Sequence, residues 1–145
     1  MKTTKKIVTV VRLQIQAGKA NPAPPVGQVL GQYGVNSGEF CKKFNDASSI
    51  YKDDVILPVE VTIYKDRTFD FIIKNPCSTH YIKQALGLLK GSGLAKRNII
   101  SSISKNKLYE IALVMKKEEK LASVPLKSLV KTLIGTCNSM GIGIK

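Results

Sequence analysis

Cys77 and His80 stand three positions apart, a spacing that would let a thiol and its base meet on one face of a helix. His80 is the only histidine in the 145 residues, and no acidic residue stands near it in sequence to orient the imidazole. The other thiols, Cys41 and Cys137, form no C-x-x-C pair, so clustered ligands for a metal are lacking. We therefore expect no enzyme, no metal site and no cofactor, and three reduced cysteines in a cytoplasm-like compartment.

A different chemistry is indicated by a helix that we expect from about Ser123 to Gly141, with an apolar arc for a core. Its remaining face carries short residues, although Ser, Thr and Gly are poor helix formers and Gly costs about 1 kcal/mol relative to Ala. Such a smooth face allows close approach by an RNA minor groove, or by another helix of the same domain; the lysines alongside favour RNA. The face and its flanking polar strip comprise Ser128, Lys131, Thr132, Gly135, Thr136, Asn138 and Ser139.

The second candidate for phosphate contact is the sequence KGSGLAKR, residues 90–97. Its glycines free backbone N–H groups to face an oxyanion, and two cations follow them. The order of residues is not the G-x-x-x-x-G-K-[ST] of a nucleotide-binding loop, so an NTPase is not indicated. A flexible connector between helices could have the same sequence pattern. The residues concerned are Gly91, Ser92, Gly93, Lys96 and Arg97.

These segments need elements to position them, and the first half of the chain predicts a small sheet with helices against it. Residues 7–16 alternate as a strand whose apolar face includes Ile7, and residues 59–64 and 69–73 alternate as a hairpin. The sequence NSGE, residues 36–39, resembles a helix capping box in which Asn36 caps and Glu39 reaches back.

After Lys74-Asn75-Pro76 the pattern predicts only helices, over residues 81–89, 104–115 and 123–141. The fold class expected is therefore α+β, with two small domains. Residues 1–74 would form a sheet-containing domain and residues 78–145 a compact three-helix domain. The hinge between them would be Asn75, Pro76 and Cys77.

Charge indicates the partner. The net charge of +13 predicts that the partner is a polyanion. No run of apolar residues is long enough to span a membrane. Residues 1–75 hold 11 basic and 7 acidic residues, whereas residues 76–145 hold 12 basic and 3 acidic, so the helical half should meet the polyanion. The chain has no tryptophan and no aromatic stacking motif. The helix face of short side chains also lacks the Arg, Asn or Gln that direct contacts to DNA bases would need. Both observations favour RNA shape over base stacking or base readout.

Four segments together carry a resemblance. AGKANPAPPVGQVLGQYGVN at residues 17–36, EFCKKFN at 39–45, the GSG loop, and KTLIGTCNSMG at 131–141 resemble ribosomal protein eleven of the large subunit, the universal stalk-base family. The resemblance covers essentially the whole chain in the same order. It implies a structural protein of a cytoplasmic or organellar ribosome, with a homeodomain-like C-terminal domain that grips large-subunit rRNA. Lysine methylation is also known in that family.

Site residues follow from the same resemblance. Gly135, Thr136, Ser139 and Met140 match positions that lie against the RNA minor groove, and Gly91 to Gly93 match a loop that becomes ordered on RNA. The N-terminal domain would face GTP-dependent translation factors, neighbouring stalk proteins and thiopeptide antibiotics. The segment concerned contains Pro22, Pro24, Pro25, Gly27 and Gln28, the last replacing a proline common in the family. The alternative from the residues alone is a free nucleic-acid-binding regulatory module with a helical reading domain.

Overall fold

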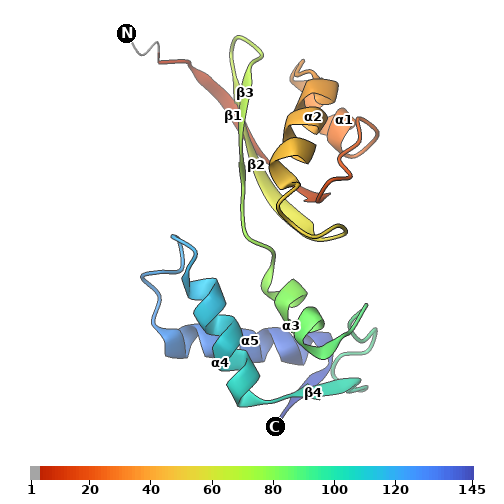
Figure 1. Cartoon of the computed structure of the whole chain (residues 1–145), viewed down its shortest axis with the longest axis vertical. Helices are drawn as coiled ribbons and strands as arrows, with labels where there is room; N and C mark the ends of the chain where they lie inside the picture. The colour runs from red at the N-terminus through yellow and green to blue at the C-terminus, as the bar shows by residue number, and fades with distance from the viewer. Residues whose placement is uncertain (1–3) are drawn as a thin grey trace. The chain divides into compact units, whose positions relative to one another are not determined.

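The structure is a computed structural model, and it describes residues 4–145 (Figure 1). The chain divides into two compact units, the first ending at Pro76 and the second running from Cys77 to Lys145. The first contains a sheet with two helices, and the second is largely helical. The expected α+β fold class is confirmed.

The first unit is built on an antiparallel sheet of order β1-β2-β3. The strands are β1 (Ile7–Gln16), β2 (Ile56–Tyr64) and β3 (Phe69–Ile73), and β2 and β3 form the expected hairpin. Helices α1 (Val26–Gln32) and α2 (Ser37–Ser48) cover one face of this sheet (Figure 1).

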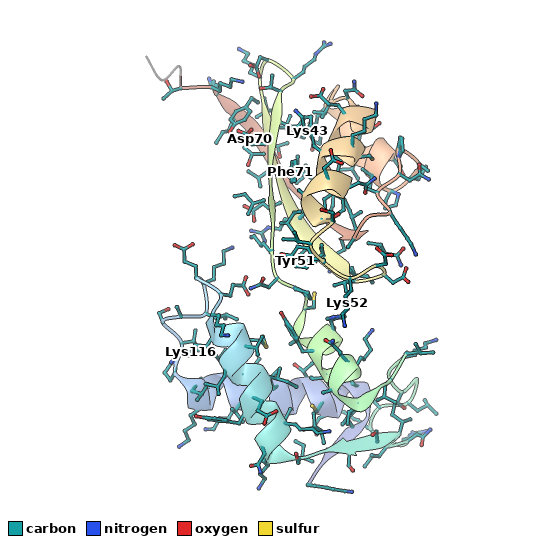
Figure 2. All side chains as sticks on the ribbon, in the orientation of Figure 1. Lys43, Tyr51, Lys52, Asp70, Phe71 and Lys116 are labelled. Atoms are coloured by element: carbon teal, nitrogen blue, oxygen red, sulfur yellow. The ribbon has the colours of Figure 1, made fainter. Side chains whose placement is uncertain are left out.

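Phenylalanine rings join α2 to the sheet. Phe40 and Phe44, one turn apart on α2, are fully buried with ring centroids 6.1 Å apart. Phe71 of β3 meets Phe40 edge-on at 5.6 Å, and Figure 2 shows it between the strand and the helix. Each ring that leaves water contributes about 1.5–3 kcal/mol. The apolar i, i+4 pair therefore sets which face of α2 meets the sheet.

The expected apolar face of β1 is right at Leu13 and Ile15, which are buried, and wrong at Ile7, which is 56% exposed. The pairing of β1 with β2 shifts register between Ile7 and Thr9. One extra residue in a strand moves the residues beyond it to the other face of the sheet. This bulge leaves no alternation signal in sequence.

Of the two contacts expected at the N-terminal cap of α2, the structure shows the one made by Asn36 and not the one made by Glu39. The Asn36 side chain accepts hydrogen bonds from the backbone N–H groups of Gly38 and Glu39, at 3.1 and 3.4 Å. Glu39 instead forms an ion pair with Lys43 at 2.7 Å, one turn along the helix. The expected return contact of Glu39 to the cap is therefore wrong, because the carboxylate has a cation to meet at i+4.

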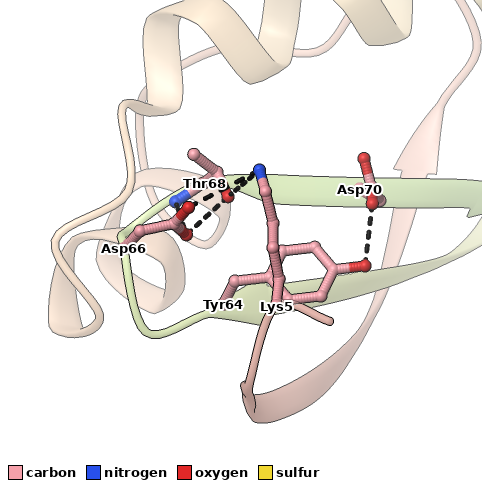
Figure 3. A network of polar contacts seen from close by, with 5 residues as sticks. All are labelled: Lys5, Tyr64, Asp66, Thr68 and Asp70. Atoms are coloured by element: carbon pink, nitrogen blue, oxygen red, sulfur yellow. Dashed lines mark hydrogen bonds and ion pairs between the residues drawn. The ribbon is translucent and has the colours of Figure 1, made fainter. Parts of the chain in front are cut away.

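A polar network fixes the tip of the hairpin (Figure 3). Asp66 accepts hydrogen bonds from the Thr68 hydroxyl at 2.6 Å and the Thr68 backbone N–H at 3.2 Å, which hold the pKa of Asp66 below its ordinary value. Lys5 donates to the Thr68 hydroxyl and lies 3.5 Å from Asp66, while Tyr64 donates to Asp70 at 2.8 Å. The start of the described chain is thereby tied to the β2–β3 turn.

The second unit packs three helices around one core, as expected. The helices are α3 (Ser78–Leu86), α4 (Lys105–Lys116) and α5 (Leu126–Met140), and Ile82, Leu108 and Leu133 from the three of them are fully buried together. Helix α4 begins at the expected cap, where Ser104 accepts from the backbone N–H of Lys107.

Two features of this unit differ from expectation. Strands β4 (Ser101–Ile103) and β5 (Ile142–Ile144) form a parallel pair where only helices were expected. With three residues each they are too short to show alternation. Helix α3 also stops before Leu89, which is 98% exposed, because Gly87 adopts the left-handed conformation with φ of +64°.

Candidate nucleic-acid interface

Helix α5 separates an apolar and a short polar face, as its sequence predicts. Leu129, Leu133 and Cys137 are buried in the core of the unit. Met140 and Thr136 are half-buried at the edges. The residues exposed on the rest of the helix are Lys127, Ser128, Lys131, Thr132, Gly135, Asn138 and Ser139.

Gly135 discriminates between the two interpretations of this face. Apart from its chain neighbours and the backbone of α5 itself, a Cβ built on Gly135 would meet no heavy atom of the second unit within 4 Å. A glycine that served close packing between helices would have a neighbour at that distance. A close helix–helix contact at Gly135 inside this unit, the alternative interpretation, is therefore wrong.

Three hydroxyl groups of the face, those of Thr132, Thr136 and Ser139, are oriented by the helix itself. Thr132 donates to the Ser128 carbonyl at 2.9 Å and Thr136 donates to the Thr132 carbonyl at 3.0 Å. Ser139 donates to the Thr136 carbonyl at 2.7 Å. Because these three hydroxyl hydrogens are used in this way, the three oxygens present acceptor lone pairs outward. The 2′-hydroxyl of RNA can donate to such an oxygen, whereas a phosphate cannot.

The glycine loop is seated on the end of α5. The backbone N–H of Ser92 donates to the Met140 carbonyl at 2.9 Å, and Ile100 donates to the Gly141 carbonyl at the same distance. Within the loop, Leu94 donates to the Ser92 hydroxyl and Asn98 to the Leu94 carbonyl, at 3.1 and 2.8 Å. A freely flexible connector would not have these contacts at both ends. The structure thus brings the two candidate RNA-contacting segments together.

The charge of the loop lies on its open side. Gly93, Lys96 and Arg97 are exposed, while Gly91 and Ser92 are half-buried against the helix end. A groove runs between loop and helix, lined by Ala95, Lys96, Ile99, Asn138, Gly141, Ile142 and Gly143. Ile99 and Gly143 were not predicted from sequence, because Gly143 lies in the short strand β5 and Ile99 precedes the short strand β4, and neither strand has a periodic signal.

The proline-rich segment belongs to the first unit. Pro22, Pro24, Pro25 and Gln28 are exposed, and Gly27 is half-buried in the first turn of α1. A depression beside the prolines is lined by residues of β1 and of this segment: Gln14, Ile15, Gln16, Lys19, Asn21, Ala23, Pro24, Pro25 and Val26. The segment offers an exposed apolar surface with one flanking lysine.

The cysteines and the histidine show ordinary environments. Burial raises the pKa of the Cys41 and Cys137 thiols, while Cys77 is exposed and precedes α3. Burial, helped by Lys83, lowers the pKa of His80, whose ring lies edge-on to Tyr81. Among residues 4–145 no group of three His, Cys, Asp or Glu side chains could hold a metal ion.

No helix in the described part of the chain is long and apolar enough to cross a membrane. The outward face of α5, the seated basic loop and the positive charge of the second unit are together typical of a protein that binds RNA. Two family models match the chain: residues 11–69 match ribosomal protein L11, N-terminal domain, and residues 74–144 match ribosomal protein L11, RNA binding domain. The chain belongs to the ribosomal protein L11 family. It is thus a structural, RNA-binding protein of the large ribosomal subunit.

Proposed function

We propose that this chain binds large-subunit rRNA at the stalk base and supports the work of GTP-dependent translation factors there. In this proposal the second unit holds the RNA. The short face of α5 lies in a minor groove, Lys131 and Asn138 flank it, and Lys96 and Arg97 meet phosphates. Membership of a ribosomal family favours this function over a free regulatory module.

The observation that carries the proposal is the empty space over Gly135. Gly135 is a poor helix former in the middle of α5, on the exposed face of that helix. Its missing side chain makes room for no other part of the second unit. An exterior partner that approaches the helix backbone explains the residue. The acceptor oxygens of Thr132 and Thr136 on either side are suited to 2′-hydroxyl donors.

The test is the variant Gly135→Leu, bound to an rRNA fragment of the stalk base and to a scrambled RNA of equal length. Because leucine is the better helix former, we expect stability to be kept or to rise by up to about 1 kcal/mol. Affinity for the fragment should fall about 100-fold, or about 2.8 kcal/mol, because the side chain occupies the space of the RNA backbone.

Gly31→Leu is the matched control. Gly31 also lies exposed within a helix, in the first unit, and a Cβ there would likewise meet nothing within 4 Å. This control should bind the fragment as the unsubstituted chain does. Unchanged affinity in Gly135→Leu would contradict the proposed face, and equal affinity for fragment and scrambled RNA would reduce the function to unspecific basic adhesion.

We further propose a separate role for the first unit. The exposed apolar surface of Pro22, Pro24 and Pro25 supports contact with translation factors, with neighbouring stalk proteins and with thiopeptide antibiotics, because it has few charges to hold RNA by itself. Asn75, Pro76 and Cys77 lie outside helices and strands, which supports their role as a hinge.

A further inference from the structure

Two helices of the second unit end in the same way but with different surroundings. Gly87 follows α3 and Gly141 follows α5, and both are left-handed, with φ of +64° and +73°. A Cβ on Gly87 would meet nothing within 4 Å. A Cβ on Gly141 would lie 2.5 Å from the Ser92 Cβ and 2.9 Å from the Asn98 carbonyl oxygen. Helix termination alone explains Gly87 but not the close approach at Gly141.

The atoms that crowd Gly141 belong to the basic loop. Ser92 and Asn98 stand on either side of Lys96 and Arg97, and the loop is held to the helix end by the bond from Ser92 to Met140. On the far side Ile100 donates to the carbonyl of Gly141 itself. One of the two crowding atoms is a backbone oxygen, so a side-chain rotation could not relieve the contact.

We propose that Gly141 is a positioning residue for RNA binding. Its missing side chain lets the loop of residues 91–98 seat on the end of α5. The seated loop holds Lys96 on the groove that it shares with Asn138, beside the face of α5. This inference rests on the proposed RNA-binding role of that face. It adds that loop and helix form one surface because Gly141 has no side chain.

The test compares Gly141→Asn with Gly87→Asn in the full chain. Asparagine accepts the left-handed conformation more readily than other side-chain-bearing residues, so both variants keep the helix end. Only Gly141→Asn brings a Cβ against the loop. Hydrogen exchange at the Ser92 amide, measured with the rRNA fragment of the stalk base at saturation, reports seating of the loop, and we expect protection to be lost in Gly141→Asn and kept in Gly87→Asn.

A second readout is the salt dependence of binding to the rRNA fragment of the stalk base. If the unseated loop no longer brings Lys96 and Arg97 to phosphates, the slope of log K against log salt should become shallower by about 1.8. A general loss of stability would not change this slope. The substitution should also have no further effect in a chain that already carries Lys96→Gln and Arg97→Gln.

Wild-type protection at Ser92, an unchanged slope, or an additive loss with the Lys96 and Arg97 variants would each overturn the inference. Should Gly141→Asn fail to fold, Ser92→Pro removes the N–H that donates to Met140 without altering α5, and the same shallower slope is expected. If the unsubstituted chain shows no preference for the fragment over scrambled RNA, the proposed function fails instead.

Discussion

Gly27 has no room for a single methyl group. A Cβ there would lie 1.9 Å from the Pro22 carbonyl oxygen and 3.0 Å from its carbonyl carbon. Because both are backbone atoms, the proline-rich segment would have to move. We expect Gly27→Ala to lower the free energy of unfolding of the first unit by about 1–3 kcal/mol, as overpacking does. Urea denaturation measures it.

Gly31→Ala provides the comparison for Gly27, since it lies in the same helix with open space around it. That substitution should raise stability by up to about 1 kcal/mol, from helix propensity alone. If both variants changed stability in the same direction by the same amount, the close contact with Pro22 would not be what requires glycine at position 27.

Individual residues differ in how far their roles can be predicted from sequence. The short face around Gly135 is predictable, because a helix repeats regularly and its neighbours are three and four positions away. The crowding at Gly141 is not, because Ser92 and Asn98 are distant in sequence and reach it only when the loop of residues 91–98 folds onto the end of α5. From sequence Gly141 is only the end of a helix.

At the scale of elements, two separate interactions stabilise the N-terminus of α2: the Asn36 cap and the Glu39–Lys43 ion pair. Asn36 accepts from two backbone N–H groups, so Asn36→Ala should cost about 1 kcal/mol. Glu39 pairs with Lys43, so Glu39→Ala should cost only about 0.2–0.5 kcal/mol. Thermal unfolding of the single and double variants measures both. A cost of Glu39→Ala that persists in a Lys43→Ala chain would support the capping box over the ion pair.

The elements that could be predicted are those with a sustained period. Strand β2, the hairpin and α5 each present a clear repeat over many residues, and proline and glycine mark the ends of α5. Strands β4 and β5 were missed because three residues carry no period, and their pairing is decided by distant parts of the chain. The bulge in β1 was missed because the alternation at Ile7 continues in sequence but not in space.

The whole molecule combines two cores with unequal charge. Leu133 lies in the core of the second unit and Val61 in that of the first, and the two core clusters share no residue. The second unit also carries most of the net positive charge, because residues 76–145 hold 12 basic but only 3 acidic residues. Composition predicted this division of charge, and it indicates that RNA should stabilise the two cores differently.

A ligand that binds only the folded state adds stability by mass action, about 2.7 kcal/mol when its free concentration is 100 times its dissociation constant. At that concentration of the rRNA fragment of the stalk base, we expect the core amides of α5, such as that of Leu133, to exchange about 100-fold more slowly. The core amides of β2, such as that of Val61, should exchange at nearly their free rate. Hydrogen exchange read by mass spectrometry measures both in one sample. Equal slowing at Leu133 and Val61 would contradict an RNA site confined to the second unit, because it would require the fragment to hold both cores.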